Sequence, residues 1–140
     1  MGDSSLNKEI LMDHYRSPRN RAALGDADVV RRGSNPRCGD ELEIGVNFDG
    51  GMLQQVRFRG RGCSVCIASA SMMTEAVTGQ RREEAHRLYE RMKAWFSADD
   101  VGARAPLESL QPLAAVRGQS ARRRCVLLAW EALNDALGAD

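Results

Sequence analysis

The sequence predicts an α+β fold in which a small antiparallel sheet of about three strands packs against several helices. Two observations support this prediction. Apolar and polar residues alternate over residues 42–48 and again over 52–58, which is typical of strands with one buried face. From residue 64 onward the apolar residues recur at helical spacing. We therefore expect residues 1–140 to form one domain, with strands early in the chain and helices late.

The segment before the first predicted strand should contain one short helix. Leu6, Ile10 and Leu11 lie at helical spacing, and Pro18 discourages continuation of the helix. Residues 21–37 follow neither the helical nor the strand period, so they are predicted to be an irregular connector. Charged residues interrupt the first twenty positions, which excludes a signal peptide or a spanning helix there. The sequence thus predicts a cytoplasmic protein that does not enter a membrane.

The two predicted strands should form a hairpin. The sequence DGG at 49–51 supplies residues that tolerate the positive φ angles of a tight turn. In the second strand, Met52, Val56 and Phe58 are expected to share one face. The sequence GRG at 60–62 predicts a further bend, which we expect to lead into a third short strand.

The later part of the chain predicts a series of helices. The first should run from about residue 64 to a C-cap at Gly79, and the last should lie within 120–137 with Ser120 as its N-cap. Between them, Pro106 and Pro112 should divide the chain into short helical pieces. A middle helix is expected to pack on the sheet through Ala85, Leu88, Met92 and Trp95.

The overall composition is that of an ordinary globular domain. Hydrophobic residues make up 43% of the chain and charged residues 28%, and the formal net charge is +1. So balanced a charge favours neither a nucleic-acid partner nor a membrane surface. Four cysteines in a reducing compartment point to metal binding or thiol chemistry and not to disulfides.

Three cysteines lie where the predicted elements begin or end. Cys38 is in a turn before a strand, Cys63 stands between GRG and a helix start, and Cys125 lies near the start of the last helix. Their separations of 25 and 62 residues differ from the close ligand pairs of a zinc finger. Two interpretations remain open: small buried apolar residues, or one metal site assembled from distant segments.

Neighbouring residues fit the metal-site interpretation. Asp40 can add a carboxylate, which gives three thiolates and one carboxylate, a closed tetrahedral set for zinc. This set carries more negative charge than a divalent cation neutralises, and Arg122, Arg123 or Arg124 could offset the excess. An ordinary turn aspartate remains the alternative for Asp40.

The fourth cysteine, Cys66, completes a Cys-x-x-Cys sequence with Cys63. A thioredoxin-like redox pair is expected in a βαβ unit, whereas this sequence follows a hairpin. We therefore expect Cys66 to be a small packed residue in the helix, with a spare thiol near the cluster as the alternative.

Four segments together resemble the IscU family of iron–sulfur cluster assembly proteins, also represented by the N-terminal domain of NifU. They are DHYRSPRN at 13–20, NPRCGDELEI at 35–44, RGCSVCIASASMMTE at 61–75 and RRRCVLLAWEAL at 122–133. The matches follow the family order over almost the whole chain. The resemblance implies the IscU/SufU-like α+β fold for the entire domain.

Within this family the chain is more similar to the SufU branch. The long interval between Cys63 and Cys125 contains an extra segment around 96–115, which SufU-type proteins carry and IscU-type proteins lack. IscU-type proteins have a histidine directly before the last cysteine and a Leu-Pro-Pro-Val-Lys chaperone signal upstream. Here Arg124 stands in the histidine's place and GQSARR replaces the signal. The family usually has a residue other than cysteine at position 66.

The resemblance implies a Zn²⁺ site formed by Cys38, Asp40, Cys63 and Cys125. It also implies that Cys38 accepts persulfide sulfur from a cysteine desulfurase of the SufS type and passes it toward downstream assembly or acceptor proteins. The chain would be a zinc-dependent sulfurtransferase if it acts like SufU. The alternative is a non-catalytic, IscU-like scaffold on which a transient [2Fe–2S] cluster forms on the same ligands, and a third reading is a purely structural zinc.

Overall fold

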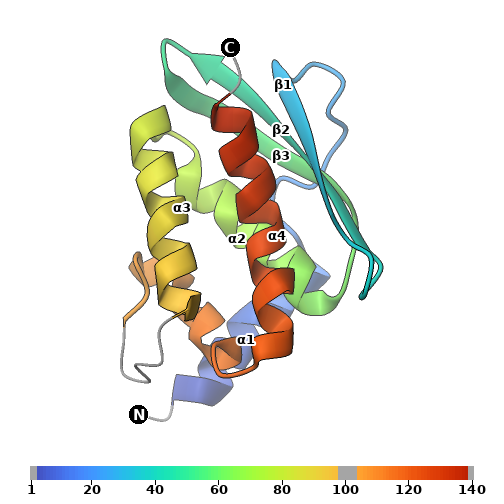
Figure 1. The fold of residues 1–140 in the computed structure, drawn as a ribbon, viewed down its shortest axis with the longest axis vertical. Coiled ribbons are helices and arrows are strands. Elements are labelled where there is room, and N and C mark those ends of the chain that lie inside the picture. Colours follow the sequence, from blue (N-terminus) through green and yellow to red (C-terminus); the bar gives the residue numbers. More distant parts are fainter. Residues whose placement is uncertain (1–2, 98–103, 139–140) are drawn as a thin grey trace.

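The computed structural model describes residues 3–97 and 104–138, and it confirms the α+β class with a three-stranded antiparallel sheet. The strands lie in the order β1–β2–β3, and the helices gather on one side of them (Figure 1). In chain order the elements are α1 (Asp3–Arg16), β1 (Val29–Asn35), β2 (Asp40–Asp49), β3 (Met52–Arg61), α2 (Ser64–Val77), α3 (Arg82–Ser97), the 3₁₀ segment η1 (Glu108–Val116) and α4 (Ser120–Leu137).

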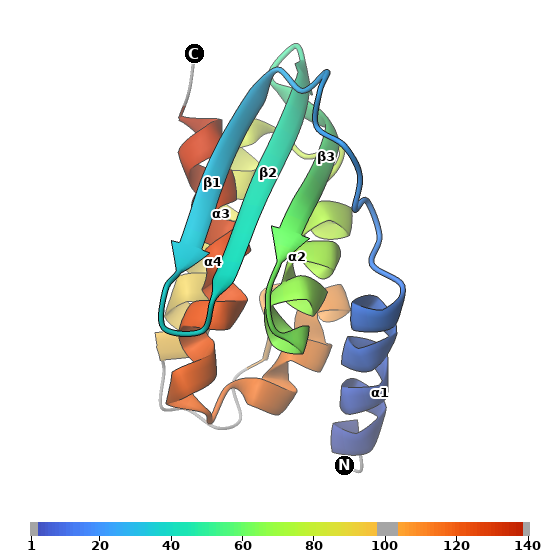
Figure 2. The same cartoon turned by 90° about the vertical axis from the view of Figure 1, so that its right-hand side faces the viewer.

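The sheet buries one face under α2 and α4, which lie behind it in Figure 2. Helix α2 contacts β3, whereas α4 contacts β1 and β2. Leu42, Ile44 and Val46 alternate along β2 and are fully buried, as the sequence pattern predicts. The two helices also pack on each other, so a continuous apolar core lies between them and the sheet.

Strand β1 falls within residues 21–37, so the prediction of an irregular connector there is wrong for 29–35. The strand is at an edge, and half-buried positions alternate with exposed ones along most of it, so it lacks the apolar pattern of a core strand. It is held by the antiparallel ladder with β2, from Val29 opposite Val46 to Asn35 opposite Asp40. Gly33 allows close packing, because an added Cβ would lie 3.2 Å from the Leu128 side chain.

The predicted hairpin between residues 42 and 58 is present. Gly50 and Gly51 turn the chain with φ angles of 59° and 88°. The ladder shifts register between Asn47 and Phe48, and at the start of β3 Leu53 is buried while Met52 is exposed. The expectation that Met52 shares the buried face is therefore wrong. The third strand of the sheet is β1, which comes before the hairpin in the chain and not after residues 60–62 as predicted. Gly60 and Arg61 end β3, and Gly62 leads from β3 toward α2.

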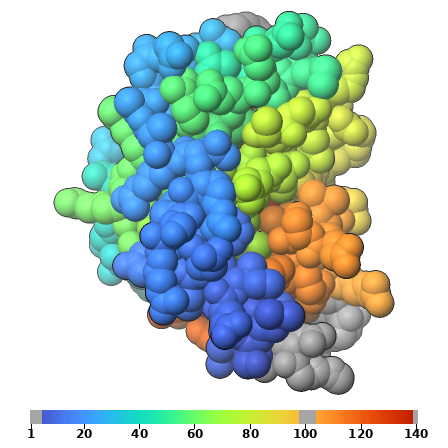
Figure 3. Space-filling view, turned by 180° about the vertical axis from the view of Figure 1, so that it is seen from behind, coloured from blue at the N-terminus to red at the C-terminus, as the bar shows by residue number. Residues whose placement is uncertain are grey.

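Helix α1 lies against α2 and η1, and it ends before Pro18 as predicted. Figure 3 shows the N-terminal segment in blue beside the orange segment that contains η1. His14 Nδ1 lies 2.7 Å from Ser71 Oγ, and Ser71 Oγ also accepts a hydrogen bond from the Arg19 backbone N–H. Burial and the positive charge of Arg19 lower the pKa of His14, so the neutral ring can accept a hydrogen bond from the Ser71 hydroxyl. This network fixes α1 to the core.

The two long helices of the second half pack on each other. The buried side of α3 lies mainly against α4 and not against the sheet, which corrects the prediction for this helix. In the core, Ser69 Oγ donates a hydrogen bond to the Val126 carbonyl and accepts one from Trp130 Nε1. Ser120 is the first residue of α4, and Gln119 occupies the N-cap without a side-chain cap, so the predicted cap is also wrong.

The segment resembling the SufU insertion is described only in part. Residues 98–103 lie outside the described residues. Phe96 and Ser97 end α3, residues 104–107 lead into η1, and η1 includes Pro112. The C-cap of α2 is Thr78, one residue before the predicted Gly79, which follows it with a φ of 89°. Among the helices of residues 3–97 and 104–138, none is long and apolar enough to span a bilayer.

Candidate metal centre

Three segments that are distant in sequence meet at one end of the sheet. Antiparallel pairing brings the end of β1, the start of β2 and the end of β3 to the same end of the sheet. Helix α2 begins directly after β3, and α4 presents its first turns to the same end (Figure 2). The cysteines at these element boundaries are thereby brought close together.

Cys38 lies in the loop that joins β1 to β2. Asn35 pairs with Asp40 across the ladder, and the Cys38 backbone N–H donates a hydrogen bond to the Asn35 carbonyl at 3.1 Å. Gly39 has a φ of 72°, a left-handed conformation that glycine adopts with little strain. The turn leaves Cys38 exposed while its neighbours in the ladder are buried. It is the accessible thiol of the group.

Asp40 is the first residue of β2, and its side chain is almost fully buried, with 1% exposure. Its Oδ1 accepts a hydrogen bond from the Cys63 backbone N–H at 2.9 Å. Its Oδ2 is buried without a hydrogen-bond partner in the described part of the chain. An unpaired buried polar atom costs about 1–3 kcal/mol, and more when it is charged. A cation beside Oδ2 would remove this cost, so the site fits a metal ligand better than an ordinary turn aspartate.

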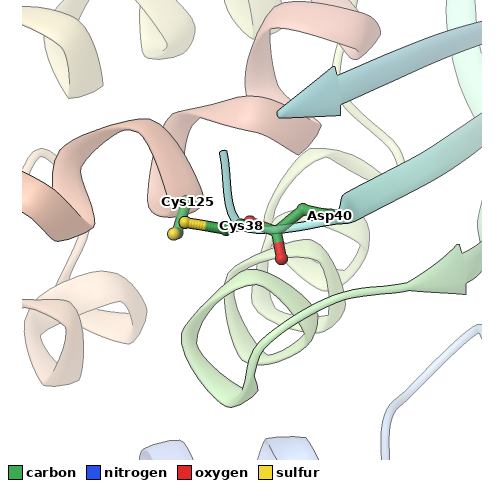
Figure 4. Close-up of side chains that lie close together, drawn as sticks. All are labelled: Cys38, Asp40 and Cys125. Carbon is green, nitrogen blue, oxygen red and sulfur yellow. The ribbon is translucent and has the colours of Figure 1, made fainter. Parts of the chain in front are cut away.

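Cys125 comes from α4 and approaches the loop from the other side of the site (Figure 4). One potential ligand atom each from Cys38, Asp40 and Cys125 lie within 4.8 Å of one another. Zinc binds thiolate sulfur at about 2.3 Å, which separates tetrahedral donors by about 3.8 Å. The spacing is therefore close to what a zinc ion requires, and the sulfur-rich donor set suits that metal.

Cys63 lies beside this group as the half-buried N-cap residue of α2. Its backbone N–H donates the hydrogen bond to Asp40 Oδ1, and its thiol lies near that of Cys125. It is outside the tight group of Cys38, Asp40 and Cys125 and adjoins that group through Asp40. The geometry thus gathers three of the four residues that the family resemblance implies as ligands, with the fourth next to them.

The protonation of the buried thiols depends on a cation. Burial raises the pKa of Cys125, and its neighbours Cys63 and Asp40 raise it further because they favour the protonated thiol. Without a cation the Cys125 thiol therefore keeps its proton. A bound dication reverses this preference, because a coordinating thiol is deprotonated outright.

The remaining two candidate residues lie close to the group in sequence but differ in burial. Cys66 is fully buried in the first turn of α2, as expected of a packed residue. Its pKa is raised by burial first and then by the charges of Asp40 and the other three cysteines. Arg124 is exposed, and within the described residues it has no hydrogen bond or ion pair that would direct it to the site.

Sequence reasoning missed three residues that shape the site. Asn35 is buried opposite Asp40, and its Oδ1 lacks a hydrogen-bond partner among the described residues. An added Cβ at Gly60 would lie 2.1 Å from the Glu41 carbonyl oxygen, and one at Gly62 would lie 2.9 Å from Cys66 Sγ. The signal for the glycines was the sequence GRG itself, which predicts a bend but not the close approach of another chain segment.

A small α+β protein with cysteines and a buried aspartate gathered at one end of its sheet is a candidate metal-binding domain. Comparison with known families is more specific. Residues 6–139 match the NifU-like N-terminal domain family, and the chain belongs to that family.

Relatives over nearly full length carry names from iron–sulfur assembly. The chain is 33% identical to the zinc-dependent sulfurtransferase SufU of Bacillus subtilis, over 97% of this chain and 92% of the relative. It is 32% identical to the iron–sulfur cluster assembly scaffold protein IscU of Thermotoga maritima, over 94% and 92% of the two chains. A crystal structure of a SufU from Fervidobacterium islandicum, described as a scaffold for the SUF system, superposes with a TM-score of 0.80 at 29% identity and covers 92% of this chain and 94% of its own.

Proposed function

We propose that this protein accepts sulfur at Cys38 from a cysteine desulfurase and passes it on for iron–sulfur cluster assembly. We also propose that Cys38, Asp40, Cys63 and Cys125 hold zinc in the resting protein. The single observation that best supports this function is the exposed thiol of Cys38 beside buried Asp40 and Cys125. The similarity to the SufU of Bacillus subtilis, named a zinc-dependent sulfurtransferase, supports the same function.

Each residue has a distinct part in this proposal. Zinc, when bound, keeps the ligating thiols deprotonated. Cys63 and Cys125 are less exposed than Cys38, so they hold their positions on the two helices while the loop presents Cys38 to a partner. Asp40 contributes a harder oxygen donor, and such a mixed set is easier to open than four thiolates.

The transfer itself is a thiol exchange. The Cys38 thiolate attacks the outer sulfur of a persulfide on the desulfurase, a new S–S bond forms, and the old S–S bond breaks. The desulfurase cysteine leaves as a thiolate, so the step needs no oxidant or reductant. Cys38 then carries the sulfur as a persulfide, and a downstream thiol takes it by the same exchange.

A desulfurase assay tests the proposal. Wild-type protein added to a cognate SufS-type desulfurase should raise the turnover of cysteine several-fold. Cys38→Ala should abolish the gain, because the accepting thiol is gone. Ser34→Ala is the matched control, since Ser34 is an exposed small residue of the same hairpin outside the donor group. No stimulation by the wild type, or full stimulation by Cys38→Ala, would contradict the proposal.

A second candidate function is a scaffold on which a transient [2Fe–2S] cluster forms on the same ligands. Its support is the name of the Thermotoga maritima relative, an assembly scaffold. Anaerobic reconstitution with iron and sulfide separates the two functions, because a scaffold should yield a cluster that transfers to an apo-acceptor. A sulfur acceptor should stimulate the desulfurase without holding a transferable cluster.

Chelation tests the third reading, a purely structural zinc. The apolar core between the sheet, α2 and α4 does not include the exposed Cys38 loop, so the metal-free protein should stay folded with a lower thermal midpoint. Circular dichroism after removal of zinc by a chelator should show the helical signal and a cooperative transition. Loss of the helical signal would instead favour a zinc on which folding depends.

A further inference from the structure

The fourth cysteine of the chain is the one member of the cluster to which the proposed function gives no role. Cys66 is fully buried and belongs to the first turn of α2. A Cβ placed on Gly62 would lie 2.9 Å from Cys66 Sγ and 3.1 Å from Asp40 Oδ1. The sulfur and the carboxylate therefore lie against the same point of the chain.

The thiol of Cys66 borders the proposed ligands. Asp40, Cys63, Cys125 and Cys38 are all near enough to act electrostatically on it. The residue is also part of the buried apolar core, as Ala68 and Ala70 are further along the same helix. Cys66 thus stands where the core meets a cluster of potential metal donors.

The position of Cys66 in α2 suits ligation together with Cys63. Cys63 is the N-cap residue, and the helix starts at Ser64, so Cys66 is the third helical residue. Side chains at the N-cap and the third helical position lie close together, as in a capping box. Two cysteines separated by two residues are also a common ligand pair in tetrahedral zinc sites.

A second, independent observation favours a cation at this point of the chain. Asp40 is 1% exposed, and its Oδ2 has no hydrogen-bond partner within the described residues. The unpartnered oxygen belongs to the residue whose other oxygen shares the Gly62 contact with Cys66 Sγ. Together with Cys38, Cys63 and Cys125, these two residues make five potential donors, one more than a tetrahedral ion takes.

We propose that Cys66 is a reserve metal ligand, which joins Asp40, Cys63 and Cys125 in holding a thiophilic divalent cation when Cys38 carries sulfur. The inference rests on the proposed sulfur-acceptor function. Cys38 is the exposed ligand on a loop, whereas Cys66 is buried on a helix, so the two thiols are suited to different tasks. On ligation the Cys66 thiol releases its proton to solvent. Three sulfurs and one oxygen are kept, and the cation is retained during sulfur transfer.

A set of variants that cannot carry sulfur at position 38 tests this role. In Cys38→Ala, extended X-ray absorption at zinc should report one equivalent of metal with three sulfur donors. Competition with a chelator should show that adding Cys66→Ser lowers zinc affinity at least tenfold in the Cys38→Ala background. The same Cys66→Ser change should cost less when Cys38 is present, since Cys38 then completes the ligand set.

Two results would overturn the inference. One is a spectrum of Cys38→Ala with only two sulfur donors, which requires no double variant and so does not depend on that variant folding. The other is an equal loss of affinity from Cys66→Ser in both backgrounds, which would make Cys66 a packing residue or a permanent ligand. Unfolding curves of the metal-free variants serve as the control for fold.

The desulfurase assay separates this inference from the proposed function. The ligand count of Cys38→Ala is measured without a desulfurase. If the wild type stimulates the desulfurase and zinc in Cys38→Ala has two sulfur donors, the reserve-ligand inference is contradicted and sulfur acceptance is supported. If the wild type does not stimulate the desulfurase and zinc in Cys38→Ala has three sulfur donors, sulfur acceptance is contradicted and Cys66 is supported as a ligand.

Discussion

Asp40→Asn should weaken zinc binding by about 100-fold or more and at the same time stabilise the metal-free protein. The first effect follows because the variant loses the anionic ligand, and even groups that only support a ligand change metal affinity about 10–100-fold. The second effect follows because the unpartnered buried Oδ2 is replaced by an amide that can donate to the neighbouring sulfur atoms. Removing an unsatisfied buried acceptor should raise the free energy of unfolding by about 1 kcal/mol or more.

The local structure around position 40 should persist in Asp40→Asn. Asparagine keeps an Oδ1 that can accept the hydrogen bond of the Cys63 N–H. Glu41→Gln is the matched control, because Glu41 is the next residue on β2, pairs with Arg32, and lies outside the donor group. Chelator competition measures the affinity, and urea unfolding without metal measures the stability. Unchanged affinity, or a metal-free protein that becomes less stable, would contradict the assignment of Asp40.

Gly60→Ala should destabilise the metal-free protein by about 3–5 kcal/mol. The φ of Gly60 is 129°, which a residue with a Cβ rarely adopts. The added Cβ would also lie 2.1 Å from the Glu41 carbonyl oxygen and 2.9 Å from Leu42 Cα, and both of these are backbone atoms that cannot rotate away. Relief requires β2 and β3 to separate at the end that supports the site.

Gly51→Ala separates the two causes of this loss. Gly51 also has a positive φ, 88°, but an added Cβ there would meet nothing within 4 Å. It should therefore cost only about 1–2 kcal/mol, from the left-handed conformation. Chemical denaturation of both variants measures the difference. Equal losses of unfolding free energy in the two variants would mean that the close backbone contact at Gly60 adds nothing to the cost of a Cβ there.

Local signals in the sequence predicted the elements that carry a regular pattern. Strand β2 has a buried apolar residue at every second position from Leu42 to Val46, and Gly50 and Gly51 fit the turn that follows. Strand β1 was missed because it is an edge strand whose residues are mostly half-buried or exposed. Its ladder with β2 comes from tertiary structure and not from its own periodicity.

The candidate site was predictable in its residues but not in its geometry. Cys38 and Cys63 stand out because each lies at the boundary of an element, and Cys125 because it lies early in the last helix. Neither spacing nor composition shows that these boundaries meet, because that depends on the order β1–β2–β3 and on the packing of α4 against the sheet. The unpartnered Oδ2 of Asp40 and the approach of Cys66 at Gly62 are likewise properties of the folded chain.

The central claim is that remote segments assemble one sulfur-rich cation site at the end of the sheet, and the coordination shell of zinc in the wild-type protein tests it most directly. Extended X-ray absorption of the purified protein should show one zinc per chain with three sulfur donors at about 2.3 Å and one oxygen donor at about 2.0–2.2 Å. Zinc surrounded only by nitrogen and oxygen, or a protein that binds no stoichiometric zinc, would contradict the account.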